Sequence, residues 1–414
     1  MKIRIKRELS FHLNCNISAY EFLFWAAYIP WLFWYAIKAT TFSYFLPEVT
    51  TKLISLYVLG VLGTRWFMKG KYTVKRVTMT AVFFGGFLIS YIITSRITFI
   101  ATMFVILSAY DMNFRKIVKV SLTIFLSVMF MAILCSKAGI IENHIFFQEN
   151  RIRESLGYTY SGLINIMFMN CFYMIMYLLG DKMKAWHWLL GTVFMFILYL
   201  KTQTRSDMII IVGLFALWLF ILRKKEFNTA SFPVKTAAVL IYPFIAVLSI
   251  VLTFIYNNNN RTWYKINEAL SGRLNLARKM YLKEGYNLFG HDIELVGNTS
   301  ILLGNKRESD YNYIDNGYLQ VAFLYGIFTL CILVGAYALA ARYAAKKHEK
   351  YLMIWLCMNA IENFIYPNLI NPDYNILCML LVITHHDLID HHISGVINRF
   401  LWQKKRKKKW LKRG

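Results

Sequence analysis

The chain has only one long hydrophilic interval, residues 257–315, and it has few acidic residues. Among 414 residues there are 22 Asp and Glu against 47 Lys and Arg, and charged residues make up only 17% of the total. The sequence also lacks a Gly-rich phosphate loop, a metal-binding Asp-x-Asp and a Ser nucleophile elbow. No local motif of a nucleotide-binding enzyme or a serine hydrolase is therefore present to explain this protein.

Cysteine offers neither a cross-link nor a zinc site. The chain has 6 cysteines, and their spacing matches no zinc motif. Cys15 precedes the first apolar run, and the others fall in apolar segments: Cys135, Cys171, Cys331, Cys357 and Cys378. We therefore expect no disulfide in the hydrophilic interval.

Apolar residues are what the chain has in excess. It is 57% hydrophobic and 17% aromatic with a mean hydropathy of +0.43, which is more apolar surface than a soluble core of this size hides. The first apolar run, residues 19–37, is too long for a signal-peptide core and lacks a small-residue cleavage site, so we expect it to be retained. The composition indicates an all-α integral membrane protein.

A hydropathy window of about 19 residues predicts about twelve transmembrane helices and shows no internal repeat. The predicted spans are 19–37, 52–68, 77–94, 97–110, 117–135, 161–180, 186–200, 208–222, 236–256, 316–340, 351–366 and 375–389.

Basic residues set the predicted orientation. With residue 1 inside, the intervals that fall in the cytoplasm carry most of the Lys and Arg, as the positive-inside rule requires. Both termini are then cytoplasmic and the long interval lies outside. The predicted layout is a basic N-terminus (1–18), nine spans (19–256), the outer loop (257–315), three spans (316–389) and a basic tail (390–414). The net charge of +25 then faces anionic lipid headgroups, not nucleic acid.

Several arginines are predicted at the outer face. Arg96 lies in a very short turn, where it is either an interfacial anchor for headgroups or a cation aimed at a lipid-linked phosphate. Arg151 and Arg153 are either solvated partners of acidic residues or an anion clamp. Arg205 directly precedes a helix, and a guanidinium beside a helix N-terminus suits a diphosphate, unless Arg205 merely anchors the turn.

Two further features concern the helix ends near the outer face. Ser206 or Asp207 is expected to cap the helix that follows Arg205. In the long interval, Leu270, Leu274, Ala277 and Tyr281 recur at helical spacing. This pattern predicts one amphipathic helix lying on the membrane face, with Ser271-Gly272-Arg273 near its start.

Acidic residues inside or beside spans are the other candidates. Asp315 is placed at the water boundary immediately before a span. Glu362 lies within a span, where a carboxylate is either functional or part of a structural ion pair, with Arg96, Arg205 or Arg273 as its expected partner. The cluster around His386 and Asp390 lies at the cytoplasmic end of the last predicted span, away from these features, and a metal site there is the less favoured interpretation.

The order of short motifs resembles the O-antigen and capsular polysaccharide polymerases of the O-antigen polymerase and ligase superfamily. The similar pieces are Thr204-Arg205-Ser206, Leu270-Ser271-Gly272-Arg273-Leu274, Leu288-Phe289-Gly290, Asp315-Asn316-Gly317-Tyr318-Leu319 and Tyr325-Gly326. The plan of about a dozen spans with one large outer loop is also similar, so the resemblance covers most of the chain. The family spacing of an Arg, ten residues and a Gly fits Arg151 to Gly162 and Arg261 to Gly272.

The resemblance implies a GT-C-like fold and a metal-independent glycosyltransferase without cofactors at the outer face of the bacterial cytoplasmic membrane. Its implied substrates are undecaprenyl-diphosphate-linked oligosaccharides, and its implied partners are membrane lipids, a chain-length regulator and a flippase. The implied catalytic residues are Arg205, Arg273, Asp315 and Glu362. The implied contacts to diphosphate or glycan are Arg96, Arg151, Arg153, Arg261, Asn316 and Tyr318.

Two alternatives stay open from the sequence. Ligases of the superfamily have a His where this chain has Asp315, so a ligase-type glycan transferase is the less favoured member, and the general base is either Asp315 or Glu362. A flippase for the same lipid-linked oligosaccharides is the alternative from another class, although transporters usually show internal repeats and compact loops.

Overall fold

The computed structural model describes residues 18–47, 49–68, 74–148, 151–223, 228–372 and 374–383, and for residues 74–83 the backbone alone. The structure is 74% helical. The helices are α1 (Ala19–Lys38), α2 (Val49–Met68), α3 (Val74–Thr94), α4 (Ile97–Ser108), α5 (Phe114–Lys137), α6 (Leu163–Leu179), α7 (Ala185–Thr202), α8 (Arg205–Leu217), α9 (Phe232–Ile255), α10 (Arg261–Ala269), α11 (Arg273–Glu284), α12 (Asn298–Leu302), α13 (Gly317–Lys346) and α14 (Lys350–Glu362). The strands β1 (Ile145–Gln148) and β2 (Arg151–Glu154) pair antiparallel.

A helix lies at every predicted span up to residue 366. Among the described residues, 5 helices are long and apolar enough to cross a membrane: Phe114–Lys137, Leu163–Lys182, Arg205–Leu222, Phe232–Ile255 and Gly317–Lys346. The predicted span 375–389 is described only to residue 383 and begins there as a short 3-10 helix, Ile376–Met379. The structure is thus that of a helical membrane protein with one small sheet, and the count of about twelve spans stays a prediction.

Polar side chains start several of these helices. Asn113 accepts a hydrogen bond from the backbone N–H of Lys116 at 3.2 Å and so caps α5. Asn316 accepts from the N–H of Leu319 at 3.0 Å and caps α13. An Asn at this position satisfies a backbone donor that the helix leaves unpaired. Helix starts next to apolar runs are therefore set locally by the sequence.

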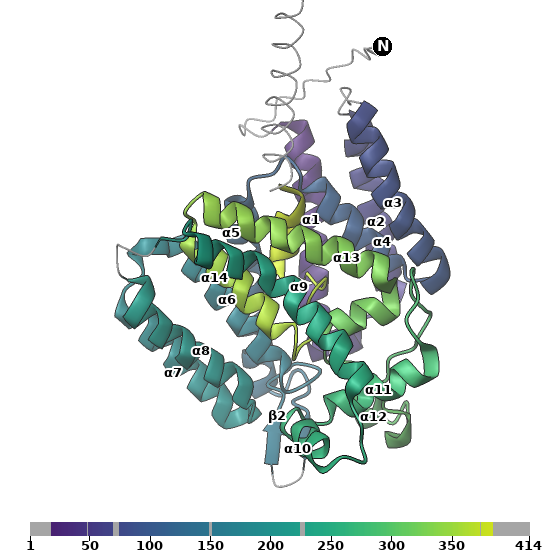
Figure 1. Cartoon of the computed structure of the whole chain (residues 1–414), viewed down its shortest axis with the longest axis vertical. Coiled ribbons are helices and arrows are strands. Elements are labelled where there is room, and N and C mark those ends of the chain that lie inside the picture. Colours follow the sequence, from purple (N-terminus) through teal and green to yellow (C-terminus); the bar gives the residue numbers. More distant parts are fainter. Residues whose placement is uncertain are drawn as a thin grey trace, which may run out of the picture.

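The centre of the bundle is the packing of α13 against α9, with α14 and α3 beside it (Figure 1). Tyr242 of α9 and Tyr337 of α13 are fully buried, and their rings stack with centroids 4.6 Å apart. The Tyr242 hydroxyl donates to the side chain of Asn359 on α14 at 2.8 Å. Buried tyrosines thus provide both apolar contact and hydrogen bonds between helices.

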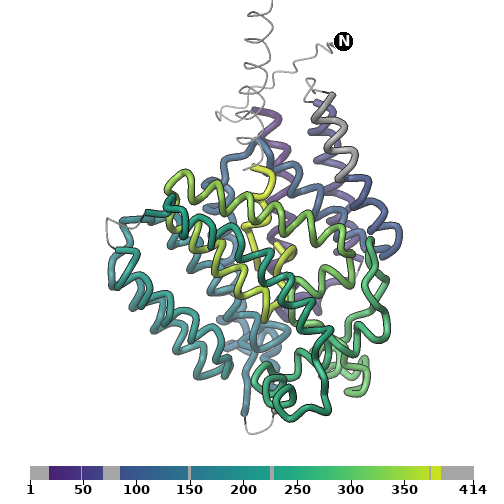
Figure 2. The backbone as a smooth tube through the Cα atoms, viewed as in Figure 1, coloured from purple at the N-terminus to yellow at the C-terminus, as the bar shows by residue number. Residues whose placement is uncertain are grey.

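Helix α13 bends sharply along its length (Figure 2), and its helical backbone is broken at Gly326, whose φ is 87° and ψ 165°. The long hydrophilic loop, residues 257–315, supplies the missing hydrogen bonds. The N–H of Ile327 donates to Asn287 O and that of Phe328 to Leu288 O, both at 3.0 Å. The break is therefore tolerated because another segment pairs the freed backbone groups.

The segments predicted to lie outside meet at one end of the bundle, which we call the loop end. Strand β2 and helices α10, α11 and α12 lie together there (Figure 1). The Thr299 hydroxyl donates to Thr159 O at 2.8 Å, joining the long loop to residues 138–162. Thr41 joins as well, because its N–H donates to Gly157 O at 2.9 Å. The structure thus gathers these loops from distant parts of the chain.

The helix predicted around Leu274, Ala277 and Tyr281 is present as α11, which begins at Arg273, so that only Leu270 lies outside it. The chain leaves the helix at Ser271 and Gly272, whose φ angles are 55° and 81°, so α10 ends before them and α11 begins after them. Leu274 and Ala277 are buried as the spacing predicted, but they lie on α11 alone, which packs against α9. Left-handed backbone at two successive residues cannot continue a right-handed helix, which explains the break.

We expect Gly326→Ala and Gly290→Ala to destabilise the protein. A Cβ at either position would lie 2.2 Å from a backbone oxygen of the facing segment, and both glycines have positive φ. Strain of this kind costs about 1–3 kcal/mol per residue. Thermal unfolding of the purified protein in detergent measures the effect.

Gly335→Ala is the matched control, since Gly335 lies in the same helix and a Cβ added there would meet no neighbouring atom within 4 Å. It should leave the Tm unchanged or slightly higher. Equal Tm values for all three variants would contradict the inferred contact between the loop and α13.

Candidate functional site

Arg153 joins the small sheet to the turn between α7 and α8. Its Nε donates to Thr202 O at 2.9 Å and its Nη2 to the Thr204 hydroxyl at 3.2 Å. Its Nη1 donates to the Tyr160 hydroxyl at 3.0 Å, and the guanidinium lies 5.3 Å from the centre of that ring. The planar fork of arginine suits such a three-sided contact, which fixes the cation at the loop end.

Arg273 and Asp315 form a loose ion pair. Arg273 Nε lies 3.7 Å from Asp315 Oδ2, and the two side chains are 25% and 30% exposed. Arg273 Nη1 donates to Leu270 O at 3.2 Å, while its Nε is buried and has no hydrogen-bond partner among the described residues. A guanidinium held this loosely keeps donor capacity for an anion.

Tyr311 lies near Arg273, Asp315 and Tyr160. Burial raises the pKa of Tyr311 above its usual value, the nearby Asp315, Tyr160 and Tyr313 raise this pKa further, and Arg273 lowers it. Tyr311 is therefore close to residues that Arg153 and Arg273 contact. We call Arg153, Tyr160, Arg273, Tyr311 and Asp315 the loop-end site; the predicted residues Arg153, Arg273 and Asp315 are brought together in it.

Arg205 lies beside the loop-end site. It is the exposed first residue of α8 and follows Thr204, whose hydroxyl accepts from Arg153. The expected cap is wrong: the residue at the cap position is Thr204, which makes no side-chain cap bond, and Asp207 is buried. The N-terminal end of α8, with the partial positive charge of its helix dipole, lies beside Arg205.

The other predicted arginines lie outside the loop-end site. Arg96 donates to Ile293 O and hydrogen-bonds the Tyr325 hydroxyl, so it anchors the long loop next to the break in α13. Arg151 is the first residue of β2 and pairs with Gln148 in the sheet register. Arg261 is the exposed first residue of α10.

Asn316, Tyr318 and Glu362 are tied to neighbouring helices. Asn316 is buried and donates to the Ser249 hydroxyl at 3.0 Å and to Phe364 O at 3.1 Å, and Tyr318 donates to Ala360 O at 2.9 Å. The expected arginine partner of Glu362 is wrong, because the Tyr173 hydroxyl on α6 donates to its carboxyl. In the described part of the chain, the partner of this carboxyl is a buried tyrosine, and no arginine forms an ion pair with it. The cluster around His386 and Asp390 lies outside the described residues.

Sequence reasoning missed Tyr160 and Tyr311. Each belongs to a Tyr-x-Tyr pair in an outer interval, Tyr158-Thr-Tyr160 and Tyr311-Asn-Tyr313. A repeated aromatic pair in two loops of a membrane protein is a signal for a shared polar surface, because tyrosine places an apolar ring and a hydroxyl at one boundary.

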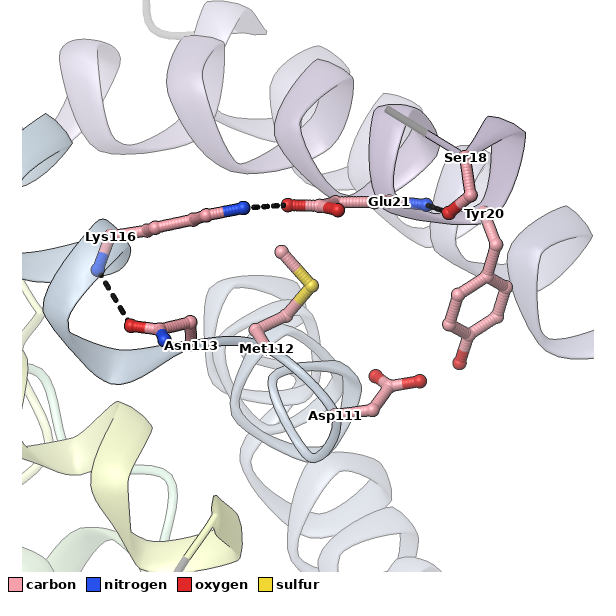
Figure 3. Close-up of a pocket in the computed structure, with 7 residues that line it drawn as sticks. All are labelled: Ser18, Tyr20, Glu21, Asp111, Met112, Asn113 and Lys116. Carbon is pink, nitrogen blue, oxygen red and sulfur yellow. Dashed lines mark hydrogen bonds and ion pairs between the residues drawn. The ribbon is translucent and has the colours of Figure 1, made fainter. Parts of the chain in front are cut away.

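A second candidate region lies at the opposite end of the bundle. A pocket of about 350 Å³ is lined by residues of α1, α5 and the turn before α5, and Figure 3 shows Lys116 paired with Glu21 across it. That ion pair is 3.1 Å long, and the pocket carboxylate Asp111 is paired with the buried Arg65 at 2.8 Å. These charges already hold helices together, so this pocket does not compete with the loop-end site.

Comparison of the chain with protein-family models, with curated proteins and with solved structures finds no match. The function has therefore to be argued from the loop-end site itself.

We expect Arg273→Ala to raise the pKa of Asp315. Burial already raises the pKa of this carboxyl above 3.8, and Arg273 lowers it. A raised pKa in the folded state means that Asp315 favours folding most below its unfolded pKa, and this contribution is lost as pH rises through the folded value. Removing the guanidinium moves that loss to higher pH. Infrared titration of the carboxyl band, with Asp315→Asn as reference, measures the change.

Lys283→Ala is the control, since Lys283 lies at the other end of α11, where it pairs with Glu284 at 3.1 Å. It should leave the titration of Asp315 in place. If the pKa of Asp315 does not rise in Arg273→Ala, the loose ion pair between Arg273 and Asp315 does not act on this carboxyl.

Proposed function

We propose that this protein is a polysaccharide polymerase that joins undecaprenyl-diphosphate-linked oligosaccharide repeat units at the outer face of the bacterial cytoplasmic membrane. The observation that carries the proposal is the convergence of Arg153 and Arg273 from two separate loops on Tyr160, Tyr311 and Asp315, at one end of an apolar helical bundle. Cations and a carboxyl at a membrane boundary suit a substrate with an anionic head and a lipid tail.

The chemistry requires charge stabilisation at the leaving group. An acceptor hydroxyl attacks the anomeric carbon of the donor sugar, the new C–O bond forms, and the bond from that carbon to the diphosphate oxygen breaks. The departing lipid diphosphate gains negative charge. Arg273 Nε makes no hydrogen bond within the described residues and only a loose contact with Asp315, and Arg205 is exposed at the N-terminus of α8, so both suit binding of the diphosphate.

Asp315 is the better placed base of the two carboxyls considered. It is 30% exposed in the loop-end site, while Glu362 accepts from Tyr173 between helices. Asp315 accepts the proton of the acceptor hydroxyl, and Arg273 keeps enough carboxylate present for this step by lowering the pKa. The proton then passes to water or to the departing diphosphate.

Apolar side chains flank the turn that carries Arg205. Leu200 near the end of α7 is 54% exposed, and Ile209 in the first turns of α8 is 71% exposed. Such side chains facing lipid leave a polyprenyl tail in the bilayer while its diphosphate reaches the arginines. This arrangement favours a lipid-linked donor over a soluble sugar nucleotide.

We expect Arg205→Ala and Arg273→Ala to stop elongation while the protein stays inserted. Loss of one fixed donor to a developing anion costs about 10²–10³-fold in rate. The measurement is the chain-length distribution of surface polysaccharide in cells that carry each variant, with single repeat units still reaching the surface. The same comparison with purified protein and a lipid-linked repeat unit gives the rates.

Arg342→Ala is the control, since Arg342 is an exposed arginine near the opposite end of α13. It should produce wild-type chains. Long polysaccharide chains in the cells of both site variants would show that the proposed site is wrong. Accumulation of lipid-linked units on the cytoplasmic face in the variants would instead indicate a flippase.

A further inference from the structure

A second polar cluster begins two residues after Arg205, in the first turn of α8. Asp207 on α8 is only 1% exposed, and its Oδ2 accepts from the Tyr366 hydroxyl at 2.8 Å. Tyr366 in turn is hydrogen-bonded to the Ser206 hydroxyl, and Tyr173 of α6 donates to Glu362 at the end of α14. The N–H of Tyr366 donates to Glu362 O at 2.8 Å, so Tyr366 joins the segments that carry the two carboxyls of Asp207 and Glu362.

In the described part of the chain these two carboxyls have no paired cation, because no Lys, Arg or His there forms an ion pair with Asp207 or Glu362. Asp207 is buried and Glu362 is half-buried. Two neighbouring carboxylates without a counter-charge are much less stable than a pair that retains a proton. Asp207 Oδ1 is buried and has no hydrogen-bond partner in the described part of the chain, so this oxygen is free to carry the proton.

The groups around the pair do not change this balance. Tyr242 on α9 lies near Glu362, and its hydroxyl donates to Asn359, while the Tyr318 hydroxyl on α13 donates to Ala360 O. Arg205 precedes Asp207 on α8, and Arg153 is bound to Thr204. The two carboxyls are thus bound by the neutral hydroxyls of Tyr173 and Tyr366.

Asp207 is connected through the first turn of α8 to the residues proposed to bind diphosphate. Ser206 and Asp207 belong to the first turn of α8, and Thr204 and Arg205 come immediately before them. Tyr366 bonds to both residues of that turn, so it fixes the start of α8 to the segment after α14. A change in this contact therefore moves Thr204 and Arg205.

We propose that Asp207 and Glu362 form a carboxyl pair with a shared proton, and that Asp207 is a positioning residue that holds Thr204 and Arg205 in place through Tyr366. The role needs a hydrogen-bond acceptor at residue 207, not a negative charge. The positioning step rests on the proposed function; the shared proton does not.

The decisive comparison is Asp207→Asn against Asp207→Ala. Asn keeps a carbonyl that accepts from Tyr366 but carries no charge, whereas Ala removes the acceptor. For the purified full-length protein in detergent, we expect Asp207→Asn to bind undecaprenyl diphosphate within about threefold of wild type. Asp207→Ala and Tyr366→Phe should bind it about tenfold more weakly, the effect of one lost hydrogen bond of about 1.4 kcal/mol.

The pH dependence of Tm tests the shared proton separately. The wild-type Tm should fall toward alkaline pH as the pair loses its proton and becomes doubly charged, and Asp207→Asn should flatten this profile because it cannot ionise. Tyr28→Phe is the control: the Tyr28 hydroxyl is fully buried against Ser121, 2.8 Å away, far along the chain from the pair. It should lower the Tm without changing the profile or the binding.

The positioning role and the shared proton are each tested by a separate result. Binding by Asp207→Asn as weak as by Asp207→Ala would show that charge is required, and wild-type binding by Tyr366→Phe would remove the positioning role. An unchanged pH profile in Asp207→Asn would overturn the shared proton. If the wild type itself does not bind undecaprenyl diphosphate, the proposed function and the positioning role fail together, while the Tm profile still decides the proton.

Discussion

The structure depends on the contact between the long hydrophilic loop, residues 257–315, and the broken helix α13. Backbone N–H groups inside an apolar bundle need partners, and the loop supplies them where Gly326 interrupts the helix. Gly290 and Gly326 allow the two backbones to approach closely because neither has a Cβ. Since the loop is held at this point, α11 and Asp315 on its two sides are held as well, and the loop-end site has a fixed frame.

Arginine side chains join several segments to one another at the loop end. Arg96 binds Ile293 O, Arg153 binds Thr202 O, and Arg278 binds Phe254 O at 3.2 Å. Each joins a side chain to the backbone of another segment, which suits a chain with few acidic residues. Arg273 differs, because its contact with Asp315 is loose and one of its donors is unused. This difference separates a cation suited to a ligand from cations that hold the fold.

Residue patterns predicted the helical membrane architecture well and the site in part. Apolar runs placed the helices to within a few residues, because burial in lipid demands long apolar segments. Arg153, Arg273 and Asp315 were predicted singly, yet the sequence did not show that Tyr160 and Tyr311 lie near them. The caps expected from Ser206 and Asp207 and the arginine partner expected for Glu362 were wrong, since each depends on a contact with a distant segment.

By itself, the sequence determined where the chain is apolar, which helices start at an Asn cap and which polar residues stand at the predicted outer boundary. These features depend on a residue and its near neighbours. Only the tertiary structure decided that Arg153 and Arg273 share one site, that Tyr366 joins Asp207 to the segment after α14, and that Gly326 breaks a helix. Hydrogen bonds and charge pairs between residues far apart in the sequence depend on how the helices pack. The helix propensity of each residue does not determine that packing.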